Sequence, residues 1–169
     1  MRKIGIESLN DNMFEAIGKE WMLVTAGTSK HFNTMTASWG GIGFLWAKNV
    51  AFVFIRPERY THEFVEANEW LTLSFLGEEH KTVHKICGSQ SGRDTDKIKE
   101  TGLTPVITEN DSVTFEEARL VLECRKLFKE QIRPECFLDK EIAGKWYNDR
   151  PGGSFHDMYI VEIVNVFVK

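Results

Sequence analysis

The chain has 169 residues, of which 42% are hydrophobic and 27% are charged, a composition typical of a soluble globular protein. This length is enough for a domain with a real hydrophobic core, and we expect a single domain over residues 1–169. The formal net charge of −4 argues against a broad surface for nucleic acid or for an anionic membrane.

The sequence also argues against export and against membrane insertion. No apolar run is long enough to span a bilayer, and the start, MRKIGIESLND, lacks the apolar segment of a signal peptide. The three cysteines, Cys87, Cys124 and Cys136, are odd in number and widely spaced, which argues against a disulfide framework. We therefore expect a cytoplasmic protein that binds neither nucleic acid nor a membrane.

Apolar periodicity and turn residues predict the elements of the N-terminal half. The run VAFVFI is almost wholly apolar, which predicts a buried strand that stops at Pro57. Thr61 suits the N-cap of the next helix and Glu63 suits its first turn. In chain order, we expect a short helix at 10–18, a strand at 21–27, a loop at 28–33, strands at 33–39 and 50–55, a helix at 62–69 and a strand at 70–76.

In the C-terminal half, Gly88 and Gly102 are expected to end two helices, the second of which begins with Asp94 or Thr95 as its cap. The expected elements are helices at 78–87, 94–102 and 136–147, loops at 88–93 and 148–157, and strands at 118–128 and 158–169. Strands outnumber helices and do not alternate with them regularly enough for a doubly wound parallel sheet. The pattern therefore favours a closed or half-closed antiparallel barrel with peripheral helices.

The stretch NTMTASWGG, residues 33–41, alternates as a strand does. Period two places the hydroxyls of Thr34, Thr36 and Ser38 on one face and apolar side chains on the other. Such a row either faces water or lets a ligand approach the backbone and bond to the hydroxyls. The stretch alone favours the first interpretation.

The segment IRPERYTH joins a buried strand to the start of a helix. Helix N-termini offer free backbone N–H groups and a partial positive charge, and Arg56, Arg59 and Thr61 add further donors. This combination is typical of an anion or phosphate site. In the alternative, Arg59 pairs with Glu58 or Glu63 at the surface. Thr61 then only caps the helix, and these residues leave both readings open.

The segment SQSGRDTDK repeats this chemistry, with hydroxyls at Ser89 and Ser91, a glycine, Arg93 and a helix start that carries Lys97. A solvated loop has the same composition, so the segment alone is weak evidence for an anion site. Two such helix starts in an acidic chain favour an anion site more than one does.

A metal site is a further alternative, because His80, His84 and Cys87 share one face of a predicted helix. Histidine and cysteine at this spacing can hold zinc. No second cluster completes a tetrahedron, however, and packing of this face in the core explains the residues as well. The sequence shows no convincing nucleophile with a neighbouring base, and Cys124 lies in an apolar strand, which is typical of a core residue. We therefore expect no metal site.

Three elements, in this order and spacing, resemble one family. They are NTMTASWGG, IRPERYTH followed by NEWLTLSF, and CGSQSGRDTDK. Together they resemble the flavin reductase-like proteins with an FMN-binding split barrel, especially the flavoredoxin-like branch. The resemblance runs from about residue 20 to about residue 105 and continues more loosely through LVLECRK and FHDMYIVEIVNV.

The resemblance implies a mainly β fold, an antiparallel, Greek-key-like split barrel, with FMN bound non-covalently in a cleft near the interface of a homodimer. The strand at 33–39 would run along the flavin, with Trp39 as a wall of its pocket. Lys97 would contact the phosphate, and His156 corresponds to a loop histidine close to the flavin. The cofactor residues that the resemblance implies are Asn33, Thr34, Met35, Thr36, Ala37, Ser38, Trp39, Arg56, Tyr60, Thr61, Ser91, Arg93, Lys97 and His156.

The function implied is that of an oxidoreductase in which FMN takes electrons from NADH, NADPH or a redox partner protein. No G-x-G-x-x-G fingerprint follows a predicted strand, so a nicotinamide would stack on the flavin in the open cleft. The alternatives are a non-enzymatic FMN-binding electron carrier and a colourless barrel that binds another anion. The residues do not separate these functions. For the homodimer, the candidate interface consists of the final strand and the segment 39–46.

Overall fold

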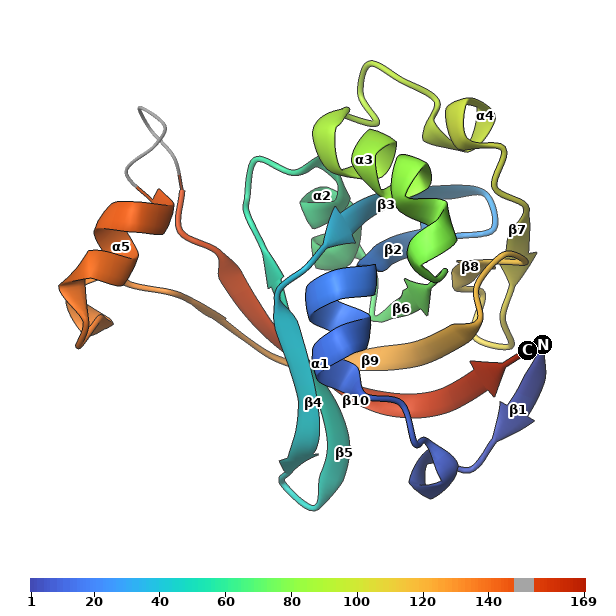
Figure 1. Ribbon diagram of the computed structural model, residues 1–169, viewed down its shortest axis with the longest axis horizontal. Coiled ribbons are helices and arrows are strands. Elements are labelled where there is room, and N and C mark those ends of the chain that lie inside the picture. Colours follow the sequence, from blue (N-terminus) through green and yellow to red (C-terminus); the bar gives the residue numbers. More distant parts are fainter. Residues whose placement is uncertain (148–153) are drawn as a thin grey trace.

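A computed structural model describes residues 1–147 and 154–169, and most of its strands form one curled antiparallel sheet (Figure 1). The strand order is β3-β2-β6-β9-β10-β5-β4, and β1 pairs with the end of β10. The bounds are β1 Arg2–Ile4, β2 Met22–Thr28, β3 His31–Ala37, β4 Gly40–Leu45, β5 Lys48–Ile55, β6 Trp70–Phe75, β9 Leu120–Gln131 and β10 Asp157–Val168. A separate hairpin consists of β7 Pro105–Ile107 and β8 Val113–Phe115.

The two edge strands of this sheet, β3 and β4, follow one another in the chain. Only Ser38 and Trp39 connect them, and such a connection reaches at most about 10 Å. The sheet must therefore curl until its edges approach each other at this connection, which we call the seam. The result is the half-closed antiparallel barrel that the sequence predicts, and the mainly β split barrel is confirmed.

The alternation of side chains along the strands divides the buried residues between two faces of the sheet. Met35, Leu73 and Tyr159 belong to the main core on the inner face. Cys87 and Phe115 belong to a second cluster on the outer face. Strand β3 is thus packed on both faces, but as an edge strand it keeps one side of its backbone free of a ladder partner.

Short helices cover the outside of the sheet. In Figure 1, α3 lies close to β3 with α4 beyond it, whereas α5 stands apart from the barrel. No helix within residues 1–147 and 154–169 is long and apolar enough to cross a membrane. The helices are α1 Met13–Glu15, continued by a π-helix at Ala16–Glu20, α2 Tyr60–Ala67, α3 Lys81–Ser89, α4 Lys97–Thr101 and α5 Lys140–Tyr147, with 3-10 turns at Ile6–Ser8, Glu78–His80 and Pro134–Cys136.

The loop predicted at 28–33 is wrong, because β2 and β3 form a tight hairpin with only Ser29 and Lys30 between the strands. Gly27 makes this hairpin possible. Its φ is 115°, and a Cβ there would lie only 2.3 Å from the carbonyl oxygen of His31. Only glycine adopts such a backbone conformation without strain.

Two helix ends also differ from the prediction. Helix α3 continues through Gly88 to Ser89, so Gly88 does not end it; a Cβ at Gly88 would lie 3.5 Å from Thr36, which shows how closely α3 packs on β3. The cap of α4 is neither Asp94 nor Thr95 but Asp96, whose carboxylate accepts from two backbone N–H groups. The predicted stop at Gly102 is confirmed.

Strand β4 has no counterpart in the sequence prediction, because three of its six residues, GGIGFL, are glycine and glycine disfavours strands. The short strands β1, β7 and β8 were likewise not expected. The helix predicted at 136–147 begins only at Lys140. The loop predicted at 148–157 lies largely outside the described residues.

Candidate functional site

Two adjacent hollows follow β3 and the seam. The first, which we call the Lys97 hollow, has a volume of about 360 Å³. The second, the Trp39 hollow, has a volume of about 210 Å³. The Lys97 hollow is lined by Phe32, Asn33, Thr34, Gly92, Arg93, Asp94, Thr95, Asp96, Lys97 and Ile98. The Trp39 hollow is lined by Met35, Thr36, Ala37, Ser38, Trp39, Phe54, Arg56, Glu58, Arg59 and His156.

Most of the predicted cofactor residues line these hollows, although they come from four separate parts of the chain. Tyr60, Thr61 and Ser91 do not line them but support residues that do. Sequence reasoning missed the contributions of Phe54, which is hidden in an apolar run, and of the bare backbone at Gly92. The assignment of these residues to a cofactor stays a prediction.

The hydroxyls of β3 already have partners within the protein. Thr34 is buried, and its hydroxyl lies 2.9 Å from that of Thr25. The Thr36 hydroxyl donates to the carbonyl oxygen of His84 at 2.7 Å. Ser38 follows the end of the strand. The hydroxyls therefore do not form an exposed row, and what β3 offers a ligand is mainly its edge backbone.

Asn33 joins β3 to the two segments that face it. Its amide nitrogen donates to the Thr61 hydroxyl at 2.7 Å, and both side chains are buried. Thr61 is therefore not the N-cap of α2; that position belongs to Arg59, which makes no side-chain cap bond. On the other side, Gly92 packs so closely that a Cβ would lie 2.1 Å from the amide oxygen of Asn33 and 3.0 Å from the ring of Tyr60.

Lys97 is the most informative charge in the site. It is only 5% exposed, and its ammonium group donates to the carbonyl oxygens of Thr34 at 2.7 Å and Cys87 at 3.2 Å. Burial lowers its pKa to about 8; the nearby Cys87 thiol opposes this effect and Arg59 adds to it. Among the described residues, no carboxylate forms an ion pair with Lys97. A buried cation without an acidic partner is costly, and a bound anion would relieve that cost.

The other cations around the sites have partners. Arg59 donates to the Cys87 carbonyl oxygen at 3.0 Å. Arg93 forms an ion pair with Glu63 and places its guanidinium 4.7 Å from the centre of the Tyr60 ring.

The Trp39 hollow combines an aromatic wall with a partly buried guanidinium. Arg56 donates to the carbonyl oxygen of Trp146 at 2.8 Å, while its Nη1 is buried without a hydrogen-bond partner among the described residues. The ring of Trp39 lies 5.2 Å from those of both Trp146 and His156. The C-terminal end of α5 therefore packs against two residues that line this hollow, Trp39 and Arg56.

The residues considered as zinc ligands have structural partners instead. His84 is buried against β3, with Nδ1 3.3 Å from the Thr36 hydroxyl. His80 bonds to the carbonyl oxygen of Leu76, and Cys87 lies in the outer core cluster. In the part of the chain that the structure describes, no group of three or more potential metal ligands comes together. His84 contributes to the packing of α3 on β3, and Cys87 contributes to the outer core cluster.

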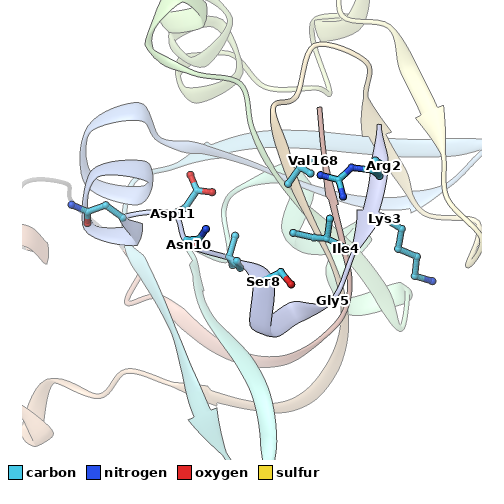
Figure 2. A pocket seen from close by; sticks show the side chains of 10 residues that line it. Arg2, Lys3, Ile4, Gly5, Ser8, Asn10, Asp11 and Val168 are labelled. Atoms are coloured by element: carbon cyan, nitrogen blue, oxygen red, sulfur yellow. The ribbon is translucent and has the colours of Figure 1, made fainter.

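A larger hollow, of about 820 Å³, lies elsewhere, between the N-terminal segment and the end of β10 (Figure 2). None of the predicted cofactor residues lines it. Two of its charged groups already have partners, because Asp11 accepts from Arg119 at 2.5 Å and Lys3 lies 3.5 Å from Glu109. We therefore give the smaller hollows beside β3 more weight as a site.

The half-closed sheet, whose edge strands are consecutive in the chain and meet at the seam, places this protein in the class of split β-barrels. The two hollows lie beside that seam. The model of the flavin reductase like domain family matches residues 14–169, and the chain belongs to this family. The resemblance drawn from the sequence is thereby confirmed, and the chain is a member of a flavin-related oxidoreductase family. No curated protein matches the chain.

Solved structures share the fold at low sequence identity. Flavoredoxin of Desulfovibrio vulgaris (Miyazaki F) is 24% identical with a TM-score of 0.67, over 88% of this chain and 69% of that chain. An FMN-binding protein from Thermus thermophilus is 20% identical with a TM-score of 0.68, over 100% and 82%. An NADH:FAD oxidoreductase of Streptomyces globisporus is 14% identical with a TM-score of 0.64, over 89% and 74%. At these identities the likeness extends to the fold alone.

Proposed function

We propose that this protein binds FMN non-covalently along β3, with the phosphate in the Lys97 hollow and the ring system in the Trp39 hollow. The observation that carries the proposal is the buried ammonium of Lys97, which has carbonyl partners but no acidic partner among the described residues. A phosphate dianion supplies the missing negative charge. Helix α4 is too short for its N-terminus to bind an anion without the charge of Lys97.

The arrangement of the two hollows also suits FMN. Asn33 and Thr34 border one hollow, and Met35 to Trp39 border the other. Successive residues of one strand therefore connect a cationic end to an aromatic end, and a strand of this length extends over about 20 Å. A long ligand with a dianion at one end and a planar ring at the other matches this order. No cysteine or histidine stands in a recognised covalent-flavin motif.

We further propose that the bound flavin passes electrons from NADH or NADPH, or from a redox partner protein, to an acceptor. The bound FMN would supply the redox chemistry, and the chain would bind it, orient it and set its electronic properties. The family match supports an oxidoreductase. Among the structural neighbours, the Streptomyces NADH:FAD oxidoreductase has also been solved with NAD and FAD fragments. The second candidate is an FMN-binding electron carrier without nicotinamide activity, as the flavoredoxin neighbours suggest.

Steady-state oxidation of NADH and NADPH by the purified protein, with and without added flavin, separates these two functions. We expect oxidation of at least one nucleotide when flavin is present. A yellow protein that is inert toward both nucleotides supports the electron carrier. A colourless protein that neither binds FMN nor oxidises either nucleotide contradicts both.

We also propose a homodimer, because the β4–β5 hairpin exposes large apolar side chains. Phe44 is 73% exposed and Trp46 is 55% exposed. The final strand is a weaker interface candidate, since β10 bonds to β5 and β9 within the sheet. We expect sedimentation at micromolar concentration to give twice the mass of the 19.5 kDa chain; a monomer with FMN bound would contradict the dimer.

The cytoplasm stays our proposed location. All three cysteines are free, and Cys87 and Cys124 are buried, as expected of a protein in a reducing compartment. Cell fractionation that recovers the protein outside the cytoplasm would refute this assignment.

A further inference from the structure

A tyrosine and a histidine form a specific pair at the edge of the Trp39 hollow. Tyr147 is the last residue of α5, and His156 directly precedes β10. The phenol oxygen of Tyr147 lies 2.9 Å from Nδ1 of His156. Tyr147 is buried, and its ring stacks on Phe155 with the ring centres 4.5 Å apart, while the Arg56 guanidinium lies 5.2 Å from its centre. These contacts fix the position of the phenol.

The direction of this hydrogen bond follows from the donors and acceptors of the two groups. Either the phenol donates to Nδ1 or Nδ1–H donates to the phenol oxygen. In the second case the buried phenol proton needs another acceptor, and no other hydrogen bond of this hydroxyl occurs among the described residues. Leaving a buried donor without a partner is costly. We therefore assign the phenol as the donor, which places the imidazole proton on Nε2.

The charge state of His156 agrees with this assignment. Burial lowers the pKa of His156 to about 4, with help from Arg56 and then Arg59, although Glu58 and Asp157 act in the opposite direction. The imidazole is thus neutral at pH 7. A neutral ring that accepts at Nδ1 presents Nε2 only as a donor.

The Trp39 hollow is richer in donors than in acceptors. Arg56 and Arg59 bring guanidinium groups, and His156 brings Nε2–H. The one carboxylate in its lining, that of Glu58, already accepts from the Ser154 hydroxyl and lies 3.9 Å from Arg56. The side chains of this hollow therefore recognise a ligand through its acceptor atoms.

We infer that Tyr147 is a positioning residue that holds His156 in the Nε2–H form, so that His156 donates a hydrogen bond to the acceptor edge of the ring bound in the Trp39 hollow. This inference rests on the proposed function, under which that ring is the flavin. The carbonyl edge of a flavin gains negative charge when the ring is reduced. A fixed neutral donor at that edge stabilises the reduced form more than the oxidised form.

The first test measures the tautomer and does not depend on flavin binding. We expect ¹⁵N–¹H spectra of the full-length, flavin-free protein at pH 7 to show His156 as the Nε2–H form, with its signals identified by comparison with His156→Gln. Tyr147→Phe should give a mixture of both tautomers. The control Tyr159→Phe removes a phenol that bonds to Glu66 instead and should leave His156 unchanged. A wild-type His156 with its proton on Nδ1 overturns the inference.

The second test measures the midpoint potential of bound FMN. His156→Leu removes the donor, and we expect the preference for reduced over oxidised FMN to fall about tenfold, which is about 30 mV for a two-electron couple. Tyr147→Phe should move the potential in the same direction by less, and His156→Gln, which keeps an N–H, should restore part of the loss. An unchanged potential in both His156→Leu and Tyr147→Phe overturns the donor role. If wild type binds no FMN, the proposed function fails, whereas the tautomer test still decides the role of Tyr147.

Discussion

Replacing Lys97 with methionine should weaken FMN binding about ten- to a hundredfold and leave riboflavin binding nearly unchanged. A charge-assisted hydrogen bond to a buried anion contributes about 1.5–3 kcal/mol, and riboflavin has the ring and the ribityl chain of FMN but no phosphate. Methionine keeps the length and packing of the side chain. Titration of both ligands into flavin-free wild type and variant measures the two losses separately.

The role proposed for Lys97 also predicts that the affinity for FMN changes with pH in one definite direction. The pKa of Lys97 is lowered to about 8 in the free protein, and a bound phosphate would raise it, because the anion favours the charged ammonium. Wild-type affinity for FMN should therefore be insensitive to this group below pH 8 and should fall as pH rises above it, by up to about tenfold per pH unit. Riboflavin binding and the Lys97→Met variant should lack this slope.

Riboflavin also serves as the control for structural damage. Lys97→Met removes a donor from the carbonyl oxygen of Thr34, whereas the carbonyl oxygen of Cys87 keeps Arg59 as a partner. If this loss distorts β3, both ligands should bind more weakly. Equal losses for FMN and riboflavin would thus retire the assignment of Lys97 to the phosphate.

Gly92→Ala should weaken FMN binding at least tenfold, through a steric effect on the loop that carries Arg93. The new methyl group would lie 2.1 Å from the amide oxygen of Asn33. Asn33 is buried and bonded to Thr61, so the loop must move instead. That movement displaces the residues leading into α4 and therefore Lys97, which isothermal titration with FMN would detect.

Gly18→Ala is a matched control, because nothing lies within 4 Å of the Cβ that it would add. Gly18 lies in the π-helical continuation of α1, where alanine is tolerated better than glycine. This variant should keep wild-type affinity and stability. An unchanged affinity in Gly92→Ala would show that the loop does not position the phosphate site.

The sequence predicted the strands with dense apolar patterns, and it predicted most of the residues that line the two hollows. Each of the strands β5, β6, β9 and β10 contains an apolar alternation or an apolar run, so its own sequence is enough to predict a strand. Strand β4 failed this reading because its glycines carry no strand signal. Its place at the sheet edge is enforced by pairing with β5, which is a non-local contact.

The roles of individual polar groups were harder to predict than their location. Thr61 looks like an N-cap in sequence, but its hydroxyl accepts from Asn33, which lies 28 residues away in the chain. The Thr34 hydroxyl is likewise bonded to Thr25 across the β2–β3 hairpin. Lys97 was identified as a cation of the site, but its burial depends on the packing of α3 and β3. Such partners are set by tertiary structure, which one-dimensional patterns do not contain.

The seam gives these observations a common origin. Because β3 and β4 are consecutive edge strands, the chain must pass from one edge of the curled sheet to the other at Ser38 and Trp39. The proposed sites for the phosphate and for the ring of the cofactor both lie along β3, whose outer edge is free of a ladder partner. The fold therefore supplies an open strand edge, and the segments around Arg56 and Lys97 supply the charges that select the ligand.

The identity of the cofactor released from the purified protein tests the central claim most directly. Denaturing the protein and separating the supernatant by chromatography should release all of the yellow colour as FMN. If the protein is purified without colour, it should bind one added FMN per chain, as the proposed single site requires. Release of FAD, colour that stays covalently attached to the chain, or a protein that takes up no flavin would contradict the account.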